Sequence, residues 1–335
     1  MSNSVYSILI FYHFKFMAVT VPPSRLKIYL AFAAIYLIWG STFLGIRFTI
    51  ETMPPLLMSG ARFLLAGLIL YTFARLQSVP NPSLKQSKTS AIIGIFLVVF
   101  GNGGVAWAEQ AVPSSMAALL IATVPLWITL LGYLFFGKPK PGIKTVLGLI
   151  LGLVGVLTLI GPDNLMGQGK IDVFSMLVII ISTVSWAFGS LYAARGKNVA
   201  APLMSTAIQM ITGGLLQLVI GAFLGEYNAL NFAAFSGKSI LAFCYLVVFG
   251  SLIGFSSYSW LIRVAPPSRV ATYAYVNPLV AVLLGWLFAN EAVTFQMLLA
   301  ALFILPAVIL ILQANAKKEQ TTLTAPPQVA VAGKD

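Results

Sequence analysis

The feature that most constrains this chain is a series of long apolar runs, each long enough to cross a lipid bilayer as a helix. A hydrocarbon core about 30 Å thick needs roughly 20 apolar residues per helix. Because 59% of the residues are hydrophobic and only 8% are charged, a soluble globular fold is excluded. We therefore predict an all-α integral membrane protein with ten transmembrane helices. The expected spans lie near residues 28–48, 56–76, 91–110, 114–136, 143–161, 173–195, 202–224, 240–263, 269–289 and 294–313.

The charged residues between the runs predict the orientation of the chain. The connections on one side are basic, with Arg75, Lys85, Lys138, Lys144, Arg195 and Arg263. Those on the other side carry mainly acidic residues, Glu51, Asp172, Glu226 and Glu291. Because basic connections stay in the cytoplasm, both termini are predicted to be cytoplasmic. The net charge of +12 is thereby explained as a topology signal, and no nucleic-acid partner is expected.

The chain is predicted to have four parts. Residues 1–27 form a cytoplasmic N-terminal segment, and residues 28–161 and 173–313 form two helical units. Residues 314–335 are rich in Thr, Ala and Pro, and we predict a disordered cytoplasmic tail. Met17 is an alternative to Met1 as the true start, because the segment that follows it leads directly into the first span. An intact mass would distinguish the two.

An internal repeat relates the two helical units. Leu97-Val-Val-Phe-Gly101 recurs as Leu246-Val-Val-Phe-Gly250. Further matches keep the same order: Trp39 with Trp186, Pro113 with Pro267, Pro125 with Pro278, and Gly132 with Gly285. Each unit contains five spans, an odd number, so the second copy is expected to enter the membrane from the opposite side. Two inverted repeats are typical of transporters, although a repeat can also serve only to stabilise a bundle.

Three stretches within the repeats resemble the EamA family of the drug/metabolite transporter superfamily. They are Trp39-Gly-Ser-Thr-Phe43, Pro113-Ser-Ser-Met-Ala-Ala-Leu-Leu120 and the run from Pro278 to Glu291. The segment Trp107-Ala-Glu109-Gln-Ala-Val-Pro113 is most similar to the YedA-like exporter branch. The resemblance covers residues 28 to 313 and implies an inner-membrane carrier that exports amino acids, metabolites or drugs. One departure is that Lys138 stands where the second repeat has Glu291, so the acidic residue occurs once.

Two charged residues of the predicted spans, Arg62 and Glu109, are the sharpest signal for a site, whereas Arg47, close to Glu51, is expected to be interfacial. Arg62 and Glu109 are both expected near the outer side, and a charge at bilayer depth costs about 2.5 kcal/mol or more. We predict that they form a charge pair, which serves either as a structural clamp or in substrate and proton handling. Glu109 is the candidate for coupling transport to protons.

The remaining candidates for substrate binding are polar, aromatic and proline residues in the spans. Asn102 and Asn277 supply hydrogen-bonding groups, and Pro125 and Pro278 are expected to kink their helices at matched places. Membrane aromatics also serve as belt or packing residues, which is the alternative for that group. The full predicted set is Trp39, Ser41, Asn102, Trp107, Glu109, Pro125, Trp186, Tyr258, Tyr273, Tyr275, Asn277 and Pro278.

The sequence favours a secondary transporter or facilitator that exports small metabolites by alternating access. A single cysteine, Cys244, and a single histidine, His13, leave few metal ligands, so no metal and no cofactor are expected. The loop that ends in Gly137-Lys138-Pro139 imitates a phosphate-binding loop, but it lacks the Ser or Thr that would hold magnesium. The expected partners are a small solute, protons and the bilayer, with the protein as a monomer or homodimer. The alternatives are a non-transporting receptor or assembly factor and, less favoured, an intramembrane enzyme.

Overall fold

The computed structural model describes residues 24–161, 172–195, 200–265 and 267–324, and the regular elements within these ranges are all helices. The prediction for residues 1–23, including the choice between Met1 and Met17, lies outside the described residues. Nine helical stretches in the described ranges are long and apolar enough to cross a membrane, and Tyr273–Ala289 is a shorter apolar helix. The chain is a multi-pass membrane protein.

Five crossings form the first half of the chain. The first is α2 (Arg25–Ala33), a π-helical segment (Ala34–Ile38) and α3 (Trp39–Thr49), and the second is α4 (Pro55–Leu76). The third joins α5 (Leu84–Gly94), a π-helical segment (Ile95–Gly103) and α6 (Gly104–Ala108). The fourth is α7 (Ser114–Ile121) with α8 (Val124–Phe135), and the fifth is α9 (Ile143–Ile160).

Five further crossings form the second half. They begin with α11 (Val173–Ala194) and α12 (Pro202–Phe223). Two short 3₁₀ turns come after α12, at Glu226–Ala229 and Phe232–Ala234. The next joins α13 (Gly237–Tyr245), a π-helical segment (Leu246–Phe255) and α14 (Ser256–Val264). The last two are α15 (Pro267–Val270) with α16 (Tyr273–Ala289), and α17 (Phe295–Thr324).

Two details differ from the sequence-based expectations. The helix α17 continues to Thr324, so the predicted tail is helical up to that residue, and residues 325–335 lie outside the described part. The two prolines do not kink their helices at matched places. Pro125 lies in the first turn of α8, where its missing N–H costs nothing, whereas Pro278 lies inside α16. The ninth crossing is interrupted earlier, at Ala271 and Thr272.

The repeat is visible in backbone geometry. The Leu-Val-Val-Phe-Gly sequence is π-helical in both copies. The fourth and ninth crossings also end alike, because the Lys138 N–H donates to the Gly132 carbonyl at 3.0 Å and the Glu291 N–H donates to the Gly285 carbonyl at 3.1 Å. The residue before each donor, Gly137 or Asn290, has a positive φ. Since each copy has five crossings, the two copies run in opposite directions through the membrane.

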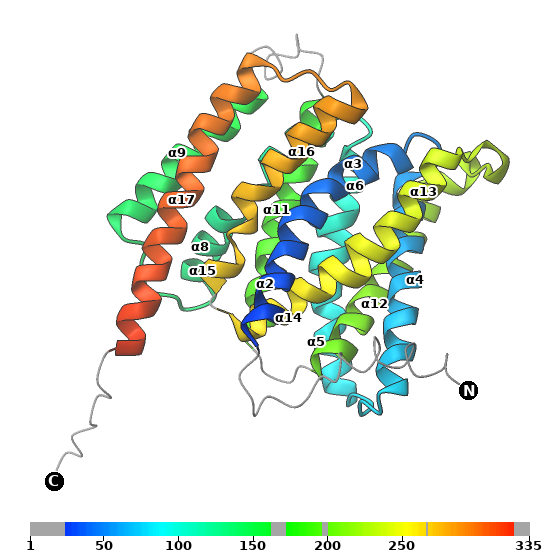
Figure 1. The fold of residues 1–335 in the computed structure, drawn as a ribbon, viewed down its shortest axis with the longest axis horizontal. Helices are drawn as coiled ribbons and strands as arrows, with labels where there is room; N and C mark the ends of the chain where they lie inside the picture. The colour runs from blue at the N-terminus through cyan, green and yellow to red at the C-terminus, as the bar shows by residue number, and fades with distance from the viewer. Residues whose placement is uncertain (1–23, 162–171, 196–199, 266, 325–335) are drawn as a thin grey trace.

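Equivalent helices of the two halves pack against each other. In Figure 1, α9 and α17 lie side by side at one flank of the bundle and α4 and α12 lie at the other. Glycines allow the close approach of α4 and α12. A Cβ atom at Gly60 would lie 2.9 Å from the Gly214 carbonyl oxygen, and one at Gly214 would lie 2.8 Å from the Gly60 oxygen. The Gly148 backbone likewise faces α17, next to Ala307. Small residues thus let helices of the two halves pack closely.

Polar and apolar side chains are distributed as a lipid environment requires. Large apolar side chains such as Leu68 and Leu153 are exposed on the outside of the bundle, whereas Thr183 and Ser205 are fully buried. Many buried hydroxyls are satisfied within the fold: the Thr183 hydroxyl, for example, donates to the Ile179 carbonyl at 2.6 Å. Those of Ser59, Ser114 and Ser256 have no hydrogen-bond partner among the described residues. The bundle therefore meets the bilayer with apolar surface and keeps its hydrogen-bonding groups inside.

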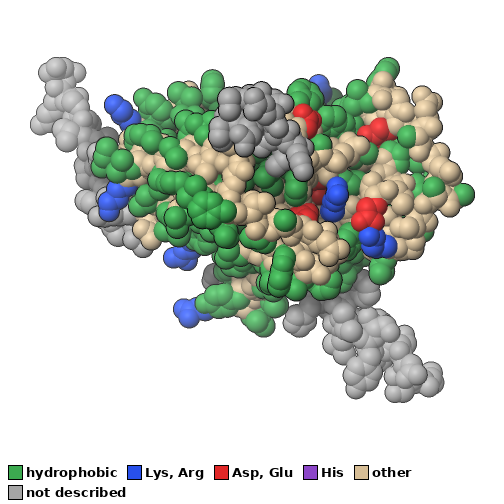
Figure 2. All heavy atoms as spheres, turned by 90° about the horizontal axis from the view of Figure 1, so that it is seen from above, with side chains coloured by type: hydrophobic (Ala, Val, Ile, Leu, Met, Phe, Trp, Pro, Cys, Tyr) green, Lys and Arg blue, Asp and Glu red, His purple; other side chains and the backbone are tan. Residues whose placement is uncertain are grey.

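The two ends of the bundle differ in charge. Four carboxylates, those of Glu51, Asp172, Glu226 and Glu291, follow or precede helices at one end. Figure 2 looks onto this end, where red acidic side chains appear at several places. Asp172 caps α11, and hydrogen bonds from the Ser175 hydroxyl and from two backbone N–H groups hold the pKa of its carboxyl below the ordinary value.

Candidate functional site

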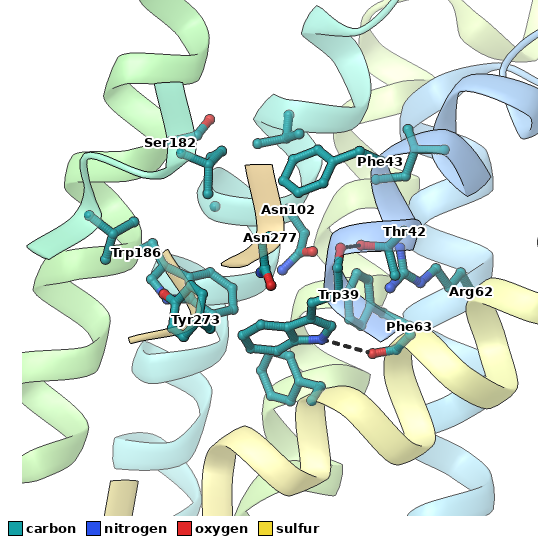
Figure 3. A pocket seen from close by; sticks show the side chains of 17 residues that line it. Trp39, Thr42, Phe43, Arg62, Phe63, Asn102, Ser182, Trp186, Tyr273 and Asn277 are labelled. Carbon is teal, nitrogen blue, oxygen red and sulfur yellow. Dashed lines mark hydrogen bonds between the residues drawn. The ribbon is translucent and has the colours of Figure 1, made fainter. Parts of the chain in front are cut away.

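A cavity of about 70 Å³ lies in the centre of the bundle, between the two halves (Figure 3). A buried water needs roughly 10–15 Å³ of such volume, so the space holds about five water molecules in this conformation. Both repeats contribute to the lining. The residues that line it are Trp39, Thr42, Phe43, Ile46, Arg62, Phe63, Gly101, Asn102, Val105, Ile121, Val124, Ser182, Trp186, Gly250, Phe255, Tyr273 and Asn277.

The π-helical segments place backbone and small residues at the cavity. Gly101 and Asn102 come from the segment in the third crossing, and Gly250 comes from its counterpart in the eighth. A third π-helical segment ends directly before Trp39, whose Nε1 donates to the Gly250 carbonyl at 3.3 Å. π-Helical turns are rare and often occur at functional sites, because the extra residue changes which side chains face the interior.

Four aromatic side chains form one cluster beside the cavity. Trp39, Trp186, Tyr258 and Tyr273 contact one another, with ring centroids 5.0 to 5.9 Å apart. Trp39 and Trp186 are the matched tryptophans of the two repeats, and they meet edge to face. The Tyr258 hydroxyl shares a 2.7 Å hydrogen bond with the Ser190 hydroxyl. We call these four residues the aromatic cluster.

A second, smaller cavity of about 40 Å³ lies beyond the aromatic cluster. Tyr273 lines both cavities, and Tyr258 lines the second. The second cavity also contacts Lys138 and Ala194, which lie at the basic end of the bundle. The aromatic cluster therefore separates the central cavity from a space that leads toward the basic end.

Arg62 is the charged residue at the cavity wall. Its side chain is 3% exposed, and its Nε donates to the Ser251 hydroxyl at 2.8 Å. The guanidinium also lies over the Phe63 ring, 4.7 Å from the centroid. The predicted ion pair with Glu109 is not formed. In the described parts of the chain, one ion pair is present, and it joins Lys238 to Glu51. The helix rotations direct Arg62 toward the eighth crossing instead.

Glu109 is fully buried at the end of α6, and in the described structure neither carboxylate oxygen has a hydrogen-bond partner. Its backbone carbonyl accepts a 3.2 Å hydrogen bond from Arg47. The carboxylate lies within electrostatic reach of Glu291, Arg47 and Arg62, but it does not line the cavity. A buried carboxyl without partners is costly. The part of Glu109 in substrate or proton handling stays a prediction.

The two predicted asparagines both line the cavity (Figure 3). The Asn102 amide donates to the Leu97 carbonyl at 3.0 Å, within its π-helical segment. The Asn277 amide, in the orientation that satisfies both of its ends, donates to the carbonyls of Ile35 and Tyr36 at 3.0 Å. Asn277 thus ties α16 to the π-helical segment of the first crossing.

Seven of the twelve predicted residues do not line the central cavity: Glu109, Tyr258, which lines the second cavity, and five others. The Ser41 hydroxyl is engaged with the Tyr245 hydroxyl at 2.5 Å. Trp107 packs against Phe174 with centroids 5.9 Å apart, and Tyr275 packs against the apolar core. Pro125 and Pro278 are buried next to Val124 and Asn277, which do line the cavity.

Sequence reasoning missed several residues at the cavity. Thr42 belongs to the Trp39-Gly-Ser-Thr stretch, and Gly250 ends the repeated sequence, so proximity to a matched motif was the available signal. Ser182, which lines the cavity, and Ser251, which contacts Arg62, carried no such signal, because isolated serines are common in membrane helices. The described residues also contain no group of three His, Cys, Asp or Glu side chains that could hold a metal ion.

Comparison with known proteins decides the family. The EamA-like transporter family matches the chain twice, over residues 26–161 and 173–313. The chain belongs to this family. The two EamA matches together contain all ten crossings, so the central cavity lies between the two family units.

Relatives of the EamA protein cover most of its length. The "Uncharacterized inner membrane transporter YedA" of Escherichia coli K12 is 39% identical over 85% of this chain and 90% of its own. The "Uncharacterized transporter YvbV" of Bacillus subtilis is 25% identical over 87% and 92%, respectively. The "Probable amino-acid metabolite efflux pump" of Escherichia coli K12 is 25% identical over 81% and 90%.

A solved crystal structure has the same fold as the EamA protein. It superposes with a TM-score of 0.62 at 19% sequence identity, over 86% of this chain and 98% of that chain. At this identity, the likeness concerns the fold alone.

Proposed function

We propose that this EamA protein is a secondary carrier of the inner membrane that exports small amphipathic metabolites, amino acids among them, by alternating access. The observation that carries the proposal is the central cavity, which corresponding elements of the two inverted halves line together. Two such halves can exchange conformations and open the space between them to either side. The names of the relatives YedA and the amino-acid metabolite efflux pump support transport and an inner-membrane location.

The orientation follows from charge. The basic ends of the helices face the cytoplasm, with both chain termini on that side, and the end that carries Glu51, Glu226 and Glu291 faces outward. In this orientation the aromatic cluster lies on the cytoplasmic side of the cavity. Solute from the cytoplasm then enters through the second cavity, and the aromatic cluster acts as the inner gate that parts to admit it.

The proposal is tested by identifying a solute and measuring its flux. The intracellular metabolites of overexpressing cells and deletion cells are compared. A solute whose level falls in the overexpressing cells and rises in the deletion cells is then loaded into proteoliposomes that contain the purified protein. Saturable release through the protein is the expected result. Saturable binding without flux would instead mean a receptor and would contradict the proposal.

A matched pair of variants tests the cavity. Thr42→Trp places an indole at the cavity wall and is expected to abolish flux, because the cavity has room for only about five water molecules. Thr72→Trp makes the same change at an exposed position of α4 and is expected to leave flux unchanged. Equal flux in the two variants would show that the solute takes another route.

A further inference from the structure

We infer that Arg62 is the receptor for a carboxylate group of the solute, so that the substrates are monocarboxylates with an apolar body. This inference rests on the proposed function, since it takes the central cavity as the solute site. Its starting point is a cation that is 3% exposed in the membrane interior and has no carboxylate within ion-pair distance in the described residues. Burial of a charge is costly unless it is paired. A substrate anion would supply the missing partner.

The guanidinium is held so that its outer nitrogens remain available. Nε is engaged by the Ser251 hydroxyl at 2.8 Å, and the plane is braced over the Phe63 ring. The two terminal nitrogens make no hydrogen bond to a described residue. In Figure 3, the Arg62 side chain reaches from α4 toward Thr42 at the edge of the cavity. A fixed fork of N–H donors matches the two oxygens of a carboxylate.

Gly250 makes room for this arrangement. A Cβ atom at position 250 would lie 2.7 Å from the Arg62 Nη2 atom and 3.0 Å from the Thr42 methyl group. Gly250 and Gly254 form a small-xxx-small pattern, which is typical of close helix packing within a membrane protein. The structure shows that these two glycines admit the side chains of Arg62 and Trp39, which belong to the site.

The rest of the lining sets the substrate class. Among the described residues that line the cavity, Arg62 alone carries a charge. An apolar body fits between the aromatic residues Trp39, Trp186 and Tyr273, and Asn102 and Thr42 offer uncharged polar contacts. An organic cation would be repelled by Arg62, and a dianion would leave one charge uncompensated in an apolar space. A single carboxylate on an apolar group satisfies the site best.

Glu109 is not the anion that pairs with the Arg62 guanidinium. It acts on Arg62 through its electrostatic field, but it lies outside ion-pair distance and outside the cavity lining. The guanidinium fork therefore stays open to a ligand in this conformation.

The experiment compares four probes that share a phenyl body: phenylacetate, phenylacetamide, phenethylamine and phenyl phosphate. Binding to the detergent-purified full chain is measured by calorimetry. Phenylacetate is expected to bind about 10- to 100-fold more tightly than phenylacetamide, because it gains hydrogen bonds to a charged group. Phenethylamine and phenyl phosphate are expected to bind more weakly than phenylacetate. Equal affinity of the carboxylate and the amide, or a preference for the amine or the phosphate, would overturn the inference.

Variants locate the effect. Arg62→Gln is expected to lose the preference for phenylacetate over phenylacetamide, and Arg62→Lys is expected to keep part of it, because the charge remains without the fork. Arg75→Gln makes the same neutral change at the exposed end of α4 and is expected to bind like the wild type. If Arg62→Gln is not monodisperse, Ser251→Ala, which removes only the Nε partner, is expected to reduce the preference. An unchanged preference in a folded Arg62→Gln protein would also overturn the inference.

The same probes separate this inference from the proposed function. If proteoliposomes transport a neutral or cationic solute and Arg62→Gln does not affect this transport, the carrier function stands and the inference about Arg62 is wrong. Binding of phenylacetate that depends on Arg62, without flux of any carboxylate, would retain the receptor and reject the carrier.

Discussion

At the scale of single residues, Arg62 and Glu109 show that two side chains at a similar depth in the membrane need not contact each other. Both occur toward the same end of the bundle, but Arg62 bonds to Ser251 of the eighth crossing and Glu109 has no partner for its carboxylate in the described structure. Two opposite charges that are near but unpaired can each respond to another ion. In the proposed carrier, Arg62 would receive the solute anion and Glu109 would receive a proton.

Substitution of Glu109 tests the proton role. Glu109→Gln keeps the size and buried position of the side chain but cannot release a proton. We expect the variant to lose the stimulation of flux by a pH gradient while it keeps downhill flux at equal pH. The measurement is uptake into vesicles with and without the gradient. Glu51→Gln, at an exposed glutamate, is the control, and a Glu109→Gln protein that still responds to the gradient would end the proton role.

At the scale of helices, two glutamates of the second half cap helices of the first half. Glu226 accepts hydrogen bonds from the Leu56 and Leu57 N–H groups at the start of α4, at 3.2 and 2.9 Å. Glu291 accepts bonds from the Ser114 and Ser115 N–H groups at the start of α7, at 2.8 and 3.0 Å. A carboxylate at a helix N-terminus satisfies free N–H groups and interacts favourably with the helix dipole. The two halves are thus joined at the acidic end.

Loss of one cap is expected to destabilise the protein. Glu291→Ala leaves two N–H groups of α7 and the Ser115 hydroxyl without their acceptor, which costs about 1–2 kcal/mol. Thermal unfolding of the purified protein measures this loss. Glu51→Ala, which removes a surface ion pair with Lys238, is expected to cost less, since such pairs contribute about 0–1 kcal/mol. Equal melting temperatures for the two variants would contradict the role of Glu291 as a cap.

At the scale of the whole molecule, the inversion of the two halves fixes which loops share a side. The loop between α4 and α5 and the 3₁₀ turn after α12 follow equivalent crossings, but they lie at opposite ends of the bundle (Figure 1). A loop that one half has on one side of the membrane therefore has its counterpart from the other half on the opposite side. Alternating access requires this relation.

Cysteine labelling tests the orientation in cells. After Cys244→Ser removes the single cysteine, Asn81→Cys and Asn228→Cys place one thiol at an exposed position at each end. A membrane-impermeant thiol reagent added to spheroplasts is expected to label Asn228→Cys and to spare Asn81→Cys until the membrane is opened. The reverse pattern would show that the basic end faces outward.

The sequence by itself determined the properties that depend on length and local composition. An apolar run of about 20 residues must be a spanning helix in lipid, so the crossings, the charge difference between the ends and the inverted repeat were readable from residue order. The tertiary structure decided how side chains pair, because pairing depends on how each helix is rotated and where two helices cross. It alone showed that Trp39 meets Trp186, that Arg62 turns to Ser251 and leaves Glu109 unpaired, and that Gly250 opens the space for the guanidinium.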